Sequence, residues 1–243
     1  MKNRALTDKP VFTVTNNTNR LGFHAAILTS IMTVVTFVIA YNTPPLSGPY
    51  SVGPGFQYPY LDIASRFPRD YYWMFSALML NVIYVVLMVC IHCYTTKERK
   101  VFSQIGLAFA LMSAVVLFID YFLQLSVIQP SLVNGEADGI SILTQFNPHG
   151  VFIALEDLGY LLMSVAFLFV AAAFSAKNKL ETVLRWIFCL NFLLTIIAFI
   201  LYSVIYGIHL EYRFEVASLS INWLTLIIAG ILLSVVFKRG MKN

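Results

Sequence analysis

Residues 101–128 read VFSQIGLAFALMSAVVLFIDYFLQLSVI, an apolar run whose single charged side chain is Asp120. About 20 helical residues are needed to cross a hydrocarbon core of roughly 30 Å, and this run is long enough. A segment in lipid must also satisfy its own backbone hydrogen bonds, which a helix does within itself. The run is therefore predicted to be a transmembrane helix that carries a carboxyl group inside the membrane.

Five further runs have the same apolar character. The chain of 243 residues is 59% hydrophobic and 12% charged, with a mean hydropathy of +0.77, whereas soluble domains are roughly 25% charged. A transmembrane β-barrel would show short alternating segments, and these runs are unbroken. We therefore expect an all-α integral membrane bundle of six transmembrane helices, forming one polytopic domain over residues 1–243. The predicted spans are residues 21–41, 72–94, 101–128, 149–174, 182–206 and 219–237.

Lysine and arginine residues divide unevenly between alternate connections. Thirteen of the 16 fall in the N-terminal segment, the second and fourth connections and the C-terminal tail, and three fall in the remaining connections. The positive-inside rule therefore predicts cytoplasmic N- and C-termini. Residues 1–20 would form a cytoplasmic arm and residues 42–71 an extracytoplasmic loop, in a plasma (inner) membrane. The larger group is Lys2, Arg4, Lys9, Arg20, Lys97, Arg99, Lys100, Lys177, Lys179, Arg185, Lys238, Arg239 and Lys242, and the smaller is Arg66, Arg69 and Arg213.

Three carboxyl groups lie within the predicted spans: Asp120 in the third, and Glu156 and Asp157 in the fourth. A charged side chain at membrane depth costs about 2.5–3.5 kcal/mol on insertion scales, and such residues usually face the bundle interior and mark a site. From the 1.5 Å rise per residue, Asp120 and Glu156 lie roughly 11–12 Å inside the outer ends of their spans. Asn81 falls at a similar level in the second span. These side chains are expected to share one layer.

The packed face of the third span is predicted from its small residues. Gly106, Ala110 and Ala114 recur at a spacing of four, which lets helix backbones approach closely. Continued outward, the same stripe reaches Asp120. Its neighbours Tyr121 and Gln124 belong to this face as well, so the packed face is also the acidic face.

On the fourth span, Glu156 and Tyr160 share one stripe, and His149 lies seven residues before Glu156 at the outer mouth. Asp157 is offset from Glu156 by about 100° around the helix. We therefore expect Asp120 and Glu156 to face a common cavity, with Asp157 packed against a neighbouring helix. The candidate ligand-binding residues are Asp120, Glu156, Asp157, Asn81, Tyr121, Gln124, Tyr160 and His149.

The Pro- and Gly-rich segment 42–71 is predicted to be either an ordered irregular cap or a floppy loop, and loops of this length often act as lids. Trp73, Trp223, Tyr202 and Tyr206 lie near span ends, where an interfacial aromatic belt is expected. Asn191, near the middle of the fifth span, is expected to bond to another helix.

The sequence predicts neither a metal centre nor a cofactor. His24 and His92 lie near the predicted inner boundary, and His149 and His209 near the outer one, so the four cannot form a single centre. The favoured interpretation is that His149 and His209 face solvent. The weaker alternative is that these two histidines bind a divalent metal together with the carboxylates of Asp120 and Glu156. No phosphate-binding loop, zinc-protease motif or dinucleotide fingerprint occurs, and no catalytic residue is assigned.

The leading hypothesis is an outward-facing intramembrane acidic pocket that binds a small cationic or amphiphilic ligand for transport or sensing. The competing hypothesis is a membrane-embedded enzyme acting on a lipid or isoprenoid-like substrate, with Glu156 and Asp120 as acid/base pair and His149 assisting. A third treats the chain as an accessory or assembly subunit whose acids only pack helices. Expected partners are membrane lipids and a small-molecule ligand, and a homo-oligomer stays open. Nucleic acid is not expected, because no basic stripe with interleaved aromatics is present.

Overall fold

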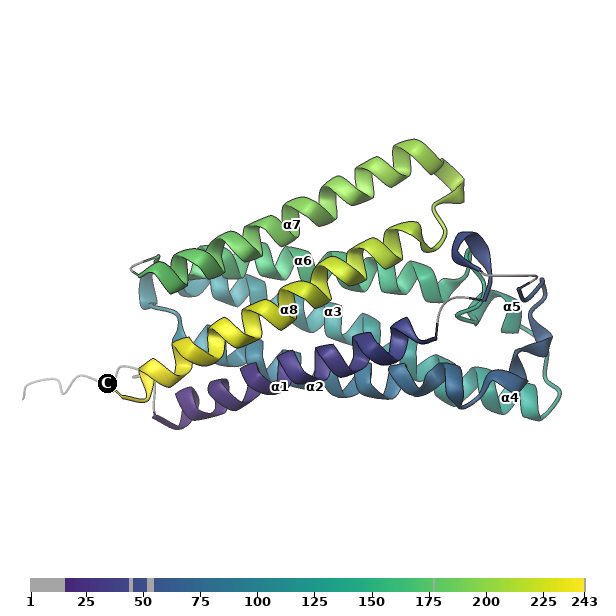
Figure 1. Ribbon diagram of the computed structural model, residues 1–243, viewed down its shortest axis with the longest axis horizontal. Coiled ribbons are helices and arrows are strands. Elements are labelled where there is room, and N and C mark those ends of the chain that lie inside the picture. The colour runs from purple at the N-terminus through teal and green to yellow at the C-terminus, as the bar shows by residue number, and fades with distance from the viewer. Residues whose placement is uncertain (1–15, 44–45, 52–54, 177, 243) are drawn as a thin grey trace, which may run out of the picture.

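The computed structural model describes residues 16–43, 46–51, 55–176 and 178–242. Within these residues the chain is all-helical and contains no strand (Figure 1). Six helices are long and apolar enough to cross a membrane, as predicted. They are α1 (Asn16–Tyr41), α2 (Tyr72–Tyr94), α3 (Lys100–Leu123), α6 (Val151–Ala173), α7 (Lys179–Tyr206) and α8 (Tyr212–Gly240).

The helix ends differ from the predicted bounds in two places that matter for the site. Helix α6 begins at Val151 rather than at the predicted residue 149, because the Asn147 side chain accepts the His149 N–H at 2.9 Å and closes the preceding turn. Helix α8 begins at Tyr212 instead of residue 219. Glu215 therefore belongs to the first turn of a spanning helix, which the sequence prediction missed.

Between α3 and α6 the chain stays largely helical. Helix α3 continues through one wide π-helical turn, Gln124–Ile128, into the short α4 (Gln129–Val133), and α5 (Ile140–Leu143) follows. The Gln124 side chain fixes this region: its amide donates to the Leu143 carbonyl at 2.6 Å, and its oxygen accepts the Gln145 N–H at 3.0 Å.

Helix α1 begins and helix α8 ends at the same end of the bundle (Figure 1). We call this the terminal end, and the opposite end, which carries residues 46–51, 55–71, 129–150 and 207–211, the loop end. Helix α1 packs on α2 and α8, α3 packs on α6, and α7 contacts α6 and α8. Helix α7 diverges from the other helices toward the loop end (Figure 1), and all its buried residues lie between Glu181 and Thr195.

Close helix contacts use the small residues. On α3, Gly106, Ala110 and Ala114 are all buried, which confirms the predicted packed face. The Ser113 hydroxyl donates to the Gly159 carbonyl of α6 at 2.7 Å, and a Cβ on Gly159 would lie 2.5 Å from Leu117. The α3–α6 pair therefore holds the two acid-bearing helices at a fixed register.

A column of polar side chains is buried between α6, α7 and α8. The Ser164 hydroxyl contacts Thr195 at 2.9 Å and Asn222 at 3.2 Å. The Asn191 amide donates to the Thr225 hydroxyl at 2.9 Å, so the predicted interhelical bond of Asn191 is confirmed. Such bonds satisfy polar groups that have no water partner in a bilayer.

The described part of residues 42–71 forms an ordered cap on the loop end. The Ser47 hydroxyl bonds the Phe146 carbonyl and lies 2.8 Å from the Tyr212 hydroxyl. Ile63 is fully buried, and the rings of Phe56 and Phe146 meet edge to face at 5.3 Å. Of the two predicted alternatives, the structure therefore favours the cap.

Candidate functional site

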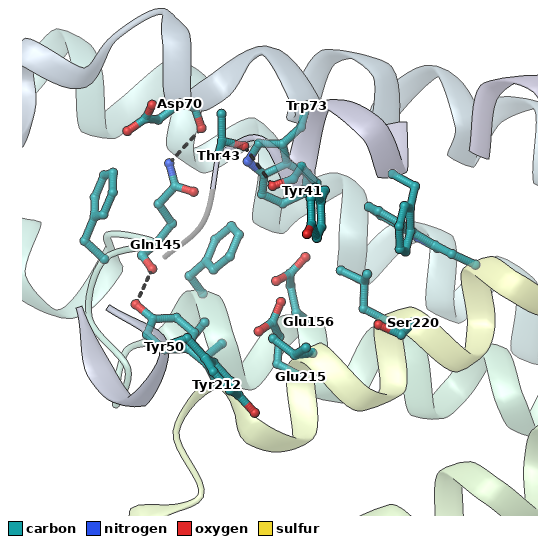
Figure 2. Close-up of a pocket in the computed structure, with 18 residues that line it drawn as sticks. Tyr41, Thr43, Tyr50, Asp70, Trp73, Gln145, Glu156, Tyr212, Glu215 and Ser220 are labelled. Carbon is teal, nitrogen blue, oxygen red and sulfur yellow. Dashed lines mark hydrogen bonds between the residues drawn. The ribbon is translucent and has the colours of Figure 1, made fainter. Parts of the chain in front are cut away.

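A cavity of about 360 Å³ lies at the loop end between α1, α2, α6 and α8 (Figure 2). Small-molecule sites typically enclose about 300–1,000 Å³ with mostly apolar walls and a few polar groups. Tyr41 and Tyr50 are the exposed residues at its rim. Burial raises the pKa of Tyr50, so its phenol remains a neutral hydrogen-bonding group. The other aromatic lining residues are Phe37, Trp73, Phe146, Phe152, Tyr212 and Trp223.

Two carboxyl groups from different helices face each other in this cavity. Glu156 lies in the second turn of α6 and Glu215 in the first turn of α8, and Figure 2 shows the two carboxyl groups side by side. Their exposed fractions are 1% and 8%. The pair exists because α6 and α8 both begin at the loop end and contact each other there.

The two carboxyl groups are unequally satisfied. The Tyr121 hydroxyl donates to Glu156 Oε1 at 2.7 Å and lies 2.9 Å from the Tyr160 hydroxyl. Glu215 Oε2 is buried without a hydrogen-bond partner among the described residues. An unsatisfied buried polar atom costs about 1–3 kcal/mol, and more when it is charged. Glu215 therefore lacks a partner that a ligand could supply.

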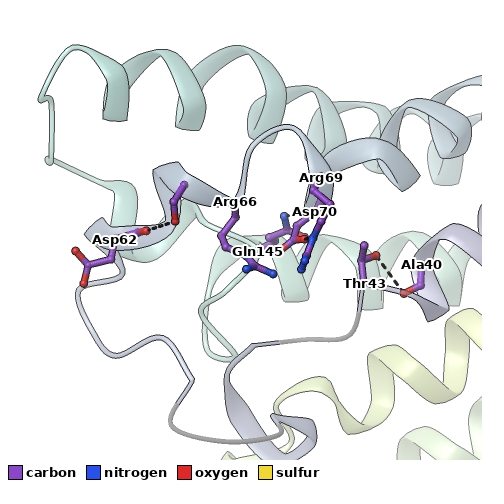
Figure 3. Close-up of polar contacts among 8 residues, drawn as sticks. Ala40, Thr43, Asp62, Arg66, Arg69, Asp70 and Gln145 are labelled. Carbon is purple, nitrogen blue, oxygen red and sulfur yellow. Dashed lines mark hydrogen bonds and ion pairs between the residues drawn. The ribbon is translucent and has the colours of Figure 1, made fainter.

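A third acid that lines the cavity, Asp70, differs from Glu156 and Glu215 because it has ion-pair partners. Its carboxylate is held by Arg66 Nε at 2.6 Å and Arg69 Nε at 2.7 Å (Figure 3). Neither Glu156 nor Glu215 has an ion-pair partner in the described part of the chain, where the remaining loop-end arginine, Arg213, pairs with Glu211 at 3.1 Å. Two neighbouring carboxyl groups without a fixed cation require a shared proton or a bound cation.

The sequence-predicted acids do not all reach the cavity. Glu156 lines it, whereas Asp120 is 1% exposed, lies outside the lining and has one carboxyl oxygen, Oδ2, without a hydrogen-bond partner among the described residues. Asp157 is half-buried on another face of α6 and also lies outside the lining. The acid that faces Glu156 across the cavity is thus Glu215 rather than Asp120.

The other candidates are spread over several environments. Tyr121 and Tyr160 lie outside the cavity lining, and the Tyr121 hydroxyl bonds to Glu156 and contacts the Tyr160 hydroxyl. Asn81 lines a separate space of about 10 Å³ together with these two tyrosines, room for at most one water. Among the described residues, Gln124 bonds to the backbone of Leu143 and Gln145, before α6. His149 is 58% exposed and lies 3.6 Å from Glu211, outside the cavity.

Sequence reasoning missed Glu215 and misassigned two tryptophans. Trp73 and Trp223 are 7% and 2% exposed and line the cavity, so their predicted role in a lipid-facing belt was wrong. A helical stripe of polar residues, Glu215, Ser218 and Asn222, all buried, is the signal that could have extended the sixth span to Glu215.

Comparisons of the chain with protein-family models, curated proteins and solved structures find no match.

Proposed function

We propose that this multi-pass membrane protein binds a small organic cation, or an amphiphile with a cationic head, in the cavity at its loop end. The observation that carries the proposal is the facing pair Glu156 and Glu215, buried without a counter-ion among the described residues. A cation placed between the two carboxylates would neutralise their repulsion and supply the partner that Glu215 Oε2 lacks.

The aromatic walls support an organic cation over a bare metal ion. Trp73 and Trp223 flank the cavity, and ring faces attract alkylammonium groups by about 0.5–2 kcal/mol each. The apolar lining, which includes Phe37 and Phe152, offers room for a short hydrocarbon tail. A hydrated inorganic ion would gain nothing from such walls.

We further propose that the loop end faces the outside of the cell, as the basic residues at the opposite end predict. The ligand would then enter from the external side for transport or sensing. The enzyme hypothesis has less support, because Asp120 and His149, two of its three named residues, do not line the cavity.

The test compares a cation with its neutral analogue. Purified protein in detergent near pH 7 is titrated with hexylammonium and with 1-hexanol, and binding is followed by calorimetry and thermal shift. Hexylammonium should bind and hexanol should bind at least tenfold more weakly, because a charge-assisted hydrogen bond contributes about 1.5–3 kcal/mol. Equal affinities would refute the proposal.

Charge-neutral variants locate the site. Glu156→Gln and Glu215→Gln should each weaken hexylammonium binding by roughly 10- to 150-fold. Asp157→Asn is the matched control, because it removes an acid on the same helix that lies outside the cavity lining, and it should bind as the wild type does. Uptake of labelled cation into proteoliposomes would then separate transport from sensing.

A further inference from the structure

A second polar cluster lies at the loop end, outside the cavity. His149 belongs to the connection between α5 and α6, and His209 and Glu211 belong to the turn between α7 and α8. One ligand atom from each of the three side chains lies within 4.8 Å of the other two. We propose that His149, His209 and Glu211 bind a divalent transition-metal ion of the zinc type.

The spacing of the ligand atoms fits a shared ion. His149 Nε2 and Glu211 Oε1 are 3.6 Å apart, too far for a strong hydrogen bond. Tetrahedral zinc with ligand bonds of 2.0–2.1 Å places neighbouring ligand atoms about 3.3 Å apart. Both histidines are exposed, so small rotations of their side chains can close the remaining distance. Two imidazoles and one carboxylate leave a fourth position for water.

Arg213 positions two of the three ligands. Its Nη1 donates to the His209 carbonyl at 2.7 Å and to Glu211 Oε2 at 3.1 Å, while the guanidinium lies 4.2 Å from the centroid of the Tyr206 ring. One carboxylate oxygen of Glu211 is thereby engaged, and the other faces His149. Partners that orient a ligand in this way commonly tune metal affinity.

The backbone of the turn also holds these ligands in place. Gly207 at φ 54° and Glu211 at φ 48° both adopt positive φ, and the second is rare for a residue with a side chain. Non-glycine residues held in sparsely populated conformations cluster at functional sites. The turn thus places His209 and Glu211 on the side that faces the α5–α6 connection.

The charge balance selects the class of ion. The carboxylate of Glu211 is offset by Arg213, so two neutral imidazoles provide most of the attraction. Imidazole ligands favour zinc, copper and nickel, whereas magnesium and calcium prefer several oxygens. We expect zinc to bind with a Kd on the order of 1–100 μM, and calcium not to compete.

The bound ion would add a link between the α7–α8 turn and the α5–α6 connection, beside the hydrogen bond from the Tyr212 hydroxyl to the Gln145 carbonyl at 2.9 Å. The half of α7 nearest the loop end has no buried residue beyond Thr195, and it diverges from the bundle (Figure 1). A metal bridge from the α7–α8 turn to His149 would tether that end. The site uses no residue of the cavity lining, so the inference does not depend on the proposed cation binding.

The experiment uses the full chain without a histidine tag, treated with chelator and titrated with ZnCl₂ in detergent. Calorimetry should show one zinc per chain, and added Co²⁺ should give the visible absorption of a four-coordinate site. His149→Gln, His209→Gln and Glu211→Gln should each weaken zinc binding by at least about 10-fold, because each removes a ligand and even the loss of a ligand's outer-shell partner commonly costs about 10- to 100-fold. His24→Gln changes an exposed histidine on α1 and should leave the affinity unchanged.

Two results would overturn the inference. The first is that no zinc binds at about 1 mM, a concentration an order of magnitude above the expected Kd range. The second is that all three variants bind zinc with wild-type affinity. Both histidines are exposed, so the metal-free His149→Gln and His209→Gln variants should keep the wild-type melting temperature, which checks folding. Hexylammonium binding to the metal-free variants should also stay unchanged, which separates this site from the cavity.

Discussion

Replacing Glu215 with glutamine is expected to make the ligand-free protein more stable and its cation binding weaker. In the wild type, Glu215 faces Glu156 and leaves a buried oxygen unsatisfied. Glutamine has nearly the same shape, carries no charge and brings two N–H donors that can reach the Glu156 carboxylate. The substitution therefore places a permanent N–H donor beside Glu156, where the acid pair of the ligand-free wild type has to share a proton.

The size of the expected stability change follows from the missing hydrogen bond of Glu215 Oε2. Satisfying a buried polar atom recovers about 1–3 kcal/mol, so the free energy of unfolding should rise by that amount. For a chain of this length, 1 kcal/mol shifts the melting temperature by roughly 2–4 °C. The same variant should lose roughly 10- to 150-fold in hexylammonium affinity, because one charge-assisted contact of about 1.5–3 kcal/mol disappears.

Thermal unfolding in detergent, with and without hexylammonium, measures both effects on one sample. The ligand-free variant should melt higher than the wild type, and the ligand-induced shift should shrink or vanish. Asp157→Asn, whose side chain lies outside the cavity lining, should keep the wild-type ligand shift. A Glu215→Gln protein that melts lower, or that responds to the cation like the wild type, would contradict the account of the acidic pair.

Three further outcomes are expected. Tyr121→Phe removes the 2.7 Å hydrogen bond to Glu156 and should lower the free energy of unfolding by about 1–3 kcal/mol, measured by thermal unfolding. Gly230→Ala places a Cβ 2.6 Å from the Ala26 carbonyl oxygen, so α1 and α8 must separate, at a cost of about 1–3 kcal/mol in the same assay. Glu136→Cys, made in a chain without its three native cysteines, should react with a membrane-impermeant reagent added to intact cells. Labelling only after lysis would place the loop end inside.

The number of spans and one helix face were predictable because they depend on local sequence. Long apolar runs need no partner to be recognised, since lipid itself requires them to be helical. The stripe from Gly106 to Ala114 likewise predicted the buried face of α3, because small residues at a helical period mark close packing whatever the neighbour is. Asn191 followed the same logic: a polar group at that depth must find a partner on another helix.

The composition of the site was not predictable in the same way. Glu215 lies in a polar segment beside Glu211 and Arg213, so hydropathy placed the start of the last span after it, whereas the structure begins α8 at Tyr212. Trp73 occupies a span end, where a lipid-facing role is the usual expectation. Its burial against Tyr121, at a ring distance of 5.2 Å, depends on how α2 lies beside α3.

The six apolar helices, and the presence of acids within them, could be predicted from the amino-acid sequence, because both follow from the hydropathy and periodicity of each segment. Which acids meet depends on the packing of the helices against one another. The partner of Glu156 is Glu215 on α8 rather than Asp120 on α3, and His149 meets His209 and Glu211 from another connection. These contacts between side chains depend on the register and rotation of each helix relative to its neighbours, which the sequence of a single helix does not specify.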